Sequence, residues 1–104
     1  MNKSLEIFEI PIPEHPELDT PDVSLFKARL TKQLHFLLEK DTATLWNGLY
    51  RIDVSEKKVK EIFEGIPDSG EIAQRLCTLI VERLIQKMKI RRAYSSDSDL
   101  DKPL

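Results

Sequence analysis

Between residues 21 and 94, apolar side chains recur every three or four residues, which is the spacing that lines one face of an α-helix. The pattern falls into four segments, over about residues 21–40, 42–50, 56–65 and 69–94. The first segment places its apolar residues within one arc of the helix: Val23, Phe26, Leu30, Leu34, Leu37 and Leu38. In the fourth segment the apolar face is wider, as expected of the central helix of a bundle or of a helix that also meets a second subunit. The sequence therefore predicts an all-α fold, a small bundle of three to four helices with no sheet in this span.

Helix-capping residues indicate where these segments begin and end. Each segment follows a residue whose side-chain oxygen can accept a hydrogen bond from the first helical turn: Thr20, Asp41, Ser55 and Asp68. Pro21 suits the first position of a helix, and Gly65 with Pro67 is expected to end the third segment. Within the second segment, Asn47 and Gly48 are also compatible with a turn, so a turn remains the alternative to a helix there.

Residues 1–21 differ from the rest of the chain because they carry four of its six prolines. Proline lacks a backbone donor and restricts the residue before it, so a helix between Pro11 and Pro21 is excluded. The same stretch holds a group of large apolar side chains: Leu5, Ile7, Phe8, Ile10 and Ile12. We expect this segment to be an extended N-terminal arm or an edge strand that docks on a surface.

The sequence leaves two destinations for this arm. Leu25 and Phe36 lie on the side of the first predicted helix opposite its apolar arc, and they offer a docking surface within the same chain. Alternatively, the arm reaches a neighbouring subunit or another protein as an added strand. Leu25, Phe36 and the apolar residues of the arm are therefore the candidate interaction residues.

Charge is distributed unevenly along the chain. Residues 1–22 carry one lysine against six acids, residues 23–94 carry fourteen cations against nine acids, and residues 95–104 carry one lysine against three acids. The basic body, at +5, is therefore flanked by an acidic start at −5 and an acidic end at −2, for a total of −2. This pattern is explained either by solvated surface charge or by an acidic arm that folds back and masks the basic body from polyanions.

The polar run Ser95-Ser96-Asp97-Ser98-Asp99 has no apolar period and predicts a disordered acidic C-terminal tail. The expected organisation is an extended arm over residues 1–21, a helical domain over 22–94 and a tail over 95–104.

Sequence motifs for catalysis or metal binding are missing. Cys77 falls within the apolar stripe of the fourth segment, as expected of a small core residue. His15 and His35 are far apart, and no group of residues has the spacing of a metal site. The chain has no glycine-rich phosphate loop and no nucleophile elbow. We therefore expect a protein that is not an enzyme and that uses no cofactor.

Arg83 is the one charged residue placed inside the apolar arc of the fourth segment. A guanidinium in that position has to reach solvent or find a partner. Asp53, Glu56 and Glu82 are the candidate carboxylates, and Asp53 is the preferred one. We predict a structural ion pair between Arg83 and Asp53.

Residues 87–92 read Lys-Met-Lys-Ile-Arg-Arg, a basic run at the end of the fourth segment. Cations at a helix C-terminus complement the helix dipole, which is a purely structural explanation. The functional alternative is a nucleic-acid-binding accessory protein that uses the helix over residues 75–92. The run is short and has no interleaved aromatic residues, so nucleic acid is not the partner we expect.

Residues 49–59, which read Leu-Tyr-Arg-Ile-Asp-Val-Ser-Glu-Lys-Lys-Val, are followed by the pairs Ile72-Ala73, Glu82-Arg83 and Gln86-Lys87. Together they resemble a group of short, uncharacterised bacterial all-helical proteins, and the resemblance covers about residues 23–94. It implies a bacterial cytosolic protein in which the link over residues 50–54 and the Glu82-Arg83 pair work together structurally. It implies no activity, cofactor or catalytic residue.

The sequence as a whole predicts a non-catalytic protein–protein interaction module whose partner is another protein or, in a homodimer, a second copy of the chain. No apolar run approaches the ~18 residues of a membrane span, and no signal peptide opens the chain. With a single cysteine, these features favour the cytoplasm.

Overall fold

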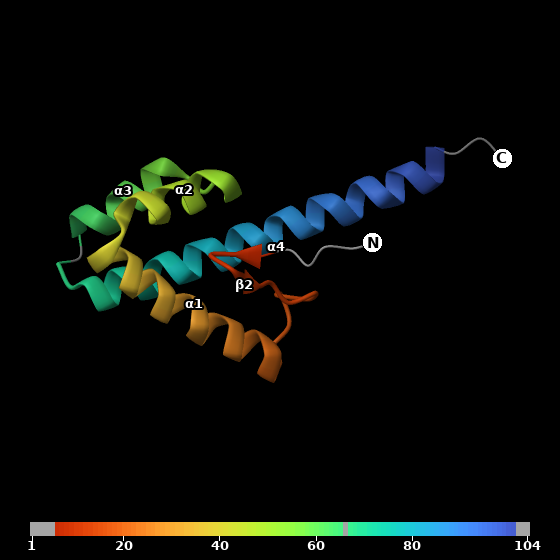
Figure 1. The fold of residues 1–104 in the computed structure, drawn as a ribbon. Coiled ribbons are helices and arrows are strands. Elements are labelled where there is room, and N and C mark those ends of the chain that lie inside the picture. Colours follow the sequence, from red (N-terminus) through yellow and green to blue (C-terminus); the bar gives the residue numbers. More distant parts are fainter. Residues whose placement is uncertain (1–5, 66, 102–104) are drawn as a thin grey trace.

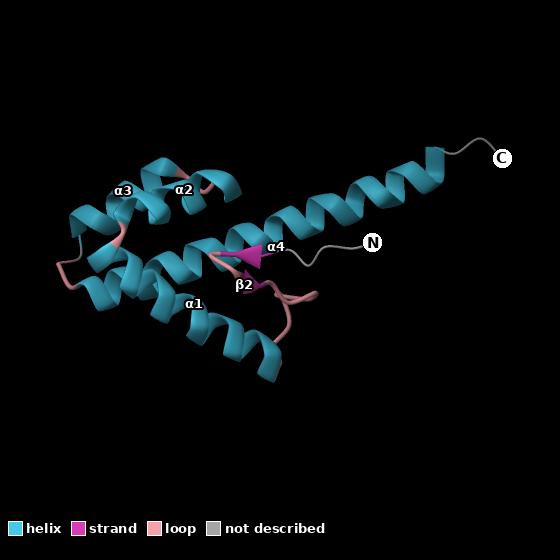
Figure 2. Cartoon of the chain, viewed as in Figure 1, coloured by secondary structure: helices cyan, strands magenta, loops and turns pink. Residues whose placement is uncertain are grey.

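The structure, a computed structural model, describes the backbone of residues 6–65 and 67–101, and the side chains of residues 6–65 and 67–93. Within this part of the chain lie four helices, α1 (Pro21–Lys40), α2 (Thr42–Ile52), α3 (Glu56–Gly65) and α4 (Ser69–Asp101). Two very short strands, β1 (Glu6–Ile7) and β2 (Ile10–Pro11), precede them. The predicted all-α fold is therefore confirmed, with a small hairpin at its start (Figure 2).

The helices begin where the capping residues predict. At each start, a side-chain oxygen lies 3.0–3.3 Å from the backbone nitrogen three residues further on and accepts its hydrogen bond: Thr20, Asp41, Ser55 and Asp68. The turn considered at Asn47 and Gly48 does not form, because α2 continues through both residues to Ile52. Asp53 then ends α2 in the left-handed conformation, at φ 60° and ψ 52°.

The core lies chiefly between α1 and α4, which pack along each other, while α2 contacts both of them and α3 covers α4 (Figure 1). Its residues are the apolar stripes predicted from the sequence. The largest fully buried side chains are Leu30, Leu34, Leu45, Leu76 and Ile80. Burying each of them contributes roughly 1.5–3 kcal/mol, so the stripes of α1, α2 and α4 are what holds the bundle together.

The N-terminal arm is paired with itself rather than fully extended. β1 and β2 form an antiparallel hairpin in which Ile7 pairs with Ile10, and the two turn residues, Phe8 and Glu9, have φ values of 51° and 66°. Two consecutive left-handed residues make the tight turn that matches the twist of a hairpin. Neither is glycine, so each costs roughly 1–2 kcal/mol of backbone strain, and contacts made by the hairpin must offset this cost.

The fourth helix is longer than the sequence predicts. We expected it to end near residue 94, whereas α4 continues to Asp101, into the segment predicted as a tail. No glycine or proline interrupts residues 95–102, so the helical backbone meets no strong breaker there. At 33 residues, α4 accounts for the elongated shape of the molecule, 57 × 29 × 25 Å, and its C-terminal part projects beyond the other helices (Figure 1).

Candidate interaction surfaces

The arm docks within its own chain. Ile7 is only 4% exposed and belongs to the same core cluster as α1 and α4, while Phe8, Ile10 and Ile12 are partly buried against it. Leu5, the fifth apolar residue of the arm, lies outside the described residues. The arm therefore packs on its own chain, which is the first of the two alternatives considered. The surface that it covers differs from the predicted one.

Gly48 in α2 forms part of the surface that receives the arm. The ring of Phe8 lies where a Cβ atom on Gly48 would be, so any larger residue at this position would collide with it. A glycine in the middle of a helix normally costs about 0.5–1 kcal/mol relative to alanine. Here it gives the Phe8 ring close access to the α2 backbone.

The outer face of α1 remains open. Leu25 and Phe36, which the sequence analysis offered as the arm's docking surface, are 52% and 54% exposed. They are eleven residues apart, or about three helical turns, so they lie on one side of α1, opposite the buried stripe that holds Leu30 and Leu34. The apolar residues of the arm pack against the core cluster and against Gly48 of α2 instead. The expectation that Leu25 and Phe36 receive the arm is therefore wrong.

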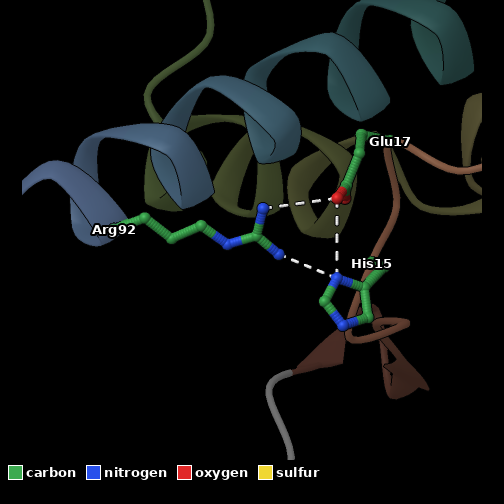
Figure 3. Close-up of polar contacts among 3 residues, drawn as sticks. All are labelled: His15, Glu17 and Arg92. Atoms are coloured by element: carbon green, nitrogen blue, oxygen red, sulfur yellow. Dashed lines mark hydrogen bonds and ion pairs between the residues drawn. The ribbon is translucent and has the colours of Figure 1, made fainter.

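A second contact ties the proline-rich part of the arm to α4 (Figure 3). Arg92 donates from Nη1 to Glu17 Oε2 at 3.3 Å and from Nη2 to His15 Nδ1 at 2.7 Å. His15 Nδ1 lies 3.5 Å from the same Glu17 oxygen. The acidic arm thus meets one residue of the predicted basic run at the end of α4.

The environment of Glu17 favours its charged form. Its own backbone N–H, and then the Arg92 guanidinium, lower the pKa of this carboxyl group, while partial burial opposes them. At neutral pH the Glu17 carboxylate therefore neutralises Arg92 locally, which is the geometry expected if the arm masks part of the basic body.

Arg83 holds the end of α2. Its Nε donates to the backbone carbonyl of Ile52 at 3.1 Å, and its Nη1 donates to Gln86 Oε1 at 2.8 Å. Its Nη2 lies 3.5 Å from Asp53 Oδ2, so the structure brings together the two residues of the predicted ion pair. The Asp53 side chain is 82% exposed, against 23% for Arg83. The shortest contacts of Arg83 are therefore with a helix-end carbonyl and an amide, and its contact with the carboxylate is open to solvent.

Sequence reasoning missed the carbonyl contact because a backbone acceptor has no residue signature. The signal that could have found it is the position of Arg83 within an apolar arc, since a cation there is well placed to complement the C-terminal dipole of a neighbouring helix.

Cys77 is buried, as the sequence predicted, with its Sγ atom 3.5 Å from the carbonyl oxygen of Lys27. Desolvation raises the pKa of its thiol, which disfavours the reactive thiolate. A shallow, open groove lies between the α2–α3 link and α4, where Lys58, Glu82 and Arg83 contribute mixed charges. Among the residues with described side chains, no group of three or more metal-ligating residues comes together.

Comparisons of this chain with protein-family models, with curated proteins and with solved structures found no match. Within the described residues, no helix is both long enough and apolar enough to span a membrane.

Proposed function

We propose that this chain is a non-catalytic protein–protein interaction module of the bacterial cytoplasm. The observation that carries the proposal is the outer face of α1, where Leu25 and Phe36 keep about half of their surface in contact with solvent. Single exposed apolar residues are common on proteins. Two large ones on one side of one helix, three turns apart, form the kind of face that a partner can cover.

The docking of the arm strengthens this argument. The most apolar free segment of the chain could have covered Leu25 and Phe36, yet Ile7 and Phe8 pack against the core and α2 instead. The hairpin of the same chain therefore leaves the outer face of α1 uncovered. Another protein, or a second copy of this chain in a homodimer, is the partner that the proposal requires.

The alternative function is that of a nucleic-acid-binding accessory protein that uses the C-terminal part of α4. Lys89 and Arg91 are exposed there, which favours contact with a polyanion. Arg92, in the same run, already pairs with Glu17, which leaves fewer cations for phosphate groups. Fluorescence anisotropy with labelled duplex DNA and RNA separates the two functions, because the interaction module binds neither at physiological salt.

The proposed function is tested with the double variant Leu25→Ser/Phe36→Ser and a matched control, Tyr50→Ser, which removes an aromatic side chain that is 64% exposed on α2. Tagged wild type and variants are compared by quantitative co-purification from the native host and by sedimentation velocity. We expect a protein partner, or self-association, that is retained by wild type and by the control but lost in the double variant. Equal recovery with all three proteins, together with an unchanged monomer mass, would refute the proposal.

A further inference from the structure

We infer that the partner of the outer α1 face is an acidic amphipathic helix of another protein. This inference rests on the proposed function and adds the chemistry of the partner. It follows from what lies between Leu25 and Phe36 on the same side of α1. Arg29 and Lys32 are both exposed there, with the small Ala28 beside them. The face is therefore a short apolar–basic–apolar stripe, which we call the α1 stripe: Leu25, Ala28, Arg29, Lys32 and Phe36.

Among the side chains that the structure describes, the two cations of the α1 stripe, Arg29 and Lys32, have no anionic partner. The nearby acid Glu39 instead contacts His35 at 3.3 Å. A partner that carries carboxylates between two apolar side chains would complement the stripe in both charge and hydrophobicity.

The order of residues in the stripe disfavours a second copy of the chain as its occupant. Arg29 and Lys32 stand at equal distances from the midpoint between Leu25 and Phe36 in the sequence. An antiparallel twofold pairing that sets Leu25 against the other copy's Phe36 would therefore set Arg29 against Lys32. A parallel pairing in the same register would set Arg29 against Arg29 of the other copy, and Lys32 against Lys32. Both arrangements bring like charges together at the centre of the interface, where repulsion is least screened.

The shape of the stripe favours a helical occupant. Leu25 and Phe36 are about 16 Å apart along α1, from eleven residues at ~1.5 Å each. A helix of about three turns spans this length and satisfies its own backbone hydrogen bonds. An extended segment would lie on α1 with no strand edge to receive its backbone groups. The complementary helix carries large apolar residues near its two ends and Asp or Glu between them.

The experiment is a selection from a displayed library of random 16-residue helical peptides, carried out separately on wild type and on Arg29→Glu/Lys32→Glu. The control is Lys57→Glu/Lys60→Glu, which reverses two exposed cations on α3. For wild type and the control, we expect peptides with Asp or Glu flanked by large apolar residues at helical spacing. For Arg29→Glu/Lys32→Glu, we expect the preference to switch to Lys and Arg.

Affinity measurements on the selected peptides then separate the two proposals. We expect at least tenfold weaker binding to Phe36→Ser than to wild type, and weaker binding at high salt. Peptides that bind wild type and Phe36→Ser with equal affinity bind a surface other than the α1 stripe. This result would count against the proposed function. Peptides that need Phe36 but show no acidic preference support the interaction module and overturn the inference of an acidic partner. A dimer of wild type that Phe36→Ser dissociates also overturns it, in favour of a second copy.

Discussion

The N-terminal hairpin and the outer face of α1 both carry large apolar side chains, but those of the hairpin are buried and those of α1 are exposed. Ile7 and Phe8 in the hairpin are packed into the molecule, and Ile7 is 4% exposed. Leu25 and Phe36 on α1 are just over half exposed, although the sequence offers each group as a surface for the other. Hydrophobicity alone therefore did not decide which apolar groups meet in this protein.

Shape explains the difference. The hairpin meets α2 at Gly48, where the missing side chain leaves room for the Phe8 ring. On the outer face of α1, the exposed cations Arg29 and Lys32 separate the two apolar residues. Close packing gains dispersion contacts that a convex, partly charged helix face does not provide.

The largest effect that tests this comparison is expected from Ile7→Ala. Because Ile7 is buried with the core residues of α1 and α4, its truncation should lower the free energy of unfolding by about 2–4 kcal/mol. The matched change Leu25→Ala, on the open face, should stay within ~0.5 kcal/mol of wild type. Urea unfolding followed by circular dichroism measures both. Equal losses at the two positions would mean that the hairpin is not docked in solution as the structure describes.

The next largest effect concerns Gly48. In an ordinary helix interior Gly→Ala stabilises by ~0.5–1 kcal/mol. Here the added methyl group meets the Phe8 ring, so Gly48→Ala should destabilise the protein by about 1–3 kcal/mol. In a Phe8→Ala background the collision disappears, and Gly48→Ala should become stabilising. A sign that does not change between the two backgrounds would place Phe8 away from Gly48.

Arg83 supports α2, the helix against which Phe8 packs. Arg83→Met removes the hydrogen bond to the Ile52 carbonyl and should cost about 1–2 kcal/mol. Asp53→Asn should cost at most ~0.5 kcal/mol, because that carboxylate is exposed. Thermal unfolding of both variants measures the difference. An unchanged or higher melting temperature for Arg83→Met would show that this contact does not support the fold.

The smallest effect is a pH dependence of the arm's contact with α4. The pKa of Glu17 is lowered in the folded protein, so the stability it contributes is present above the pKa of the unfolded chain and is lost as pH falls through the folded-state pKa. The melting temperature of wild type should exceed that of Glu17→Gln near neutral pH. The gap should close as pH falls from neutral through the lowered folded-state pKa of Glu17, because the carboxyl group then becomes protonated. A gap that is constant over this range would contradict a charged contact between Glu17 and Arg92.

Much of the helical framework could be predicted from the sequence, because caps and apolar spacing act between near neighbours. α1 has the expected bounds, and Thr20 caps it as expected. The hairpin could not be predicted, because its turn residues Phe8 and Glu9 are not those that favour positive φ. Their conformation is maintained by contacts of the hairpin with the rest of the molecule.

The candidate site was predicted in part. Leu25 and Phe36 were identified by their position opposite the apolar arc of α1, which helical geometry fixes directly. The proximity of Arg83 and Asp53 was also anticipated, whereas the contact of Arg83 with the Ile52 carbonyl was not. The contact of Glu17 with Arg92 joins residues 75 positions apart, and only the overall charge pattern hinted at it.

The sequence by itself determined where the helices of this protein begin, which faces of them are apolar and which residues carry charge, because these properties depend on spacing within a few turns. Only the tertiary structure decided that the hairpin packs against Gly48 and leaves Leu25 and Phe36 open. The physical reason is that burial energy scales with apolar area, so hydrophobicity alone does not choose between one apolar surface and another. Local shape, here the absence of one side chain on α2, then selects among them.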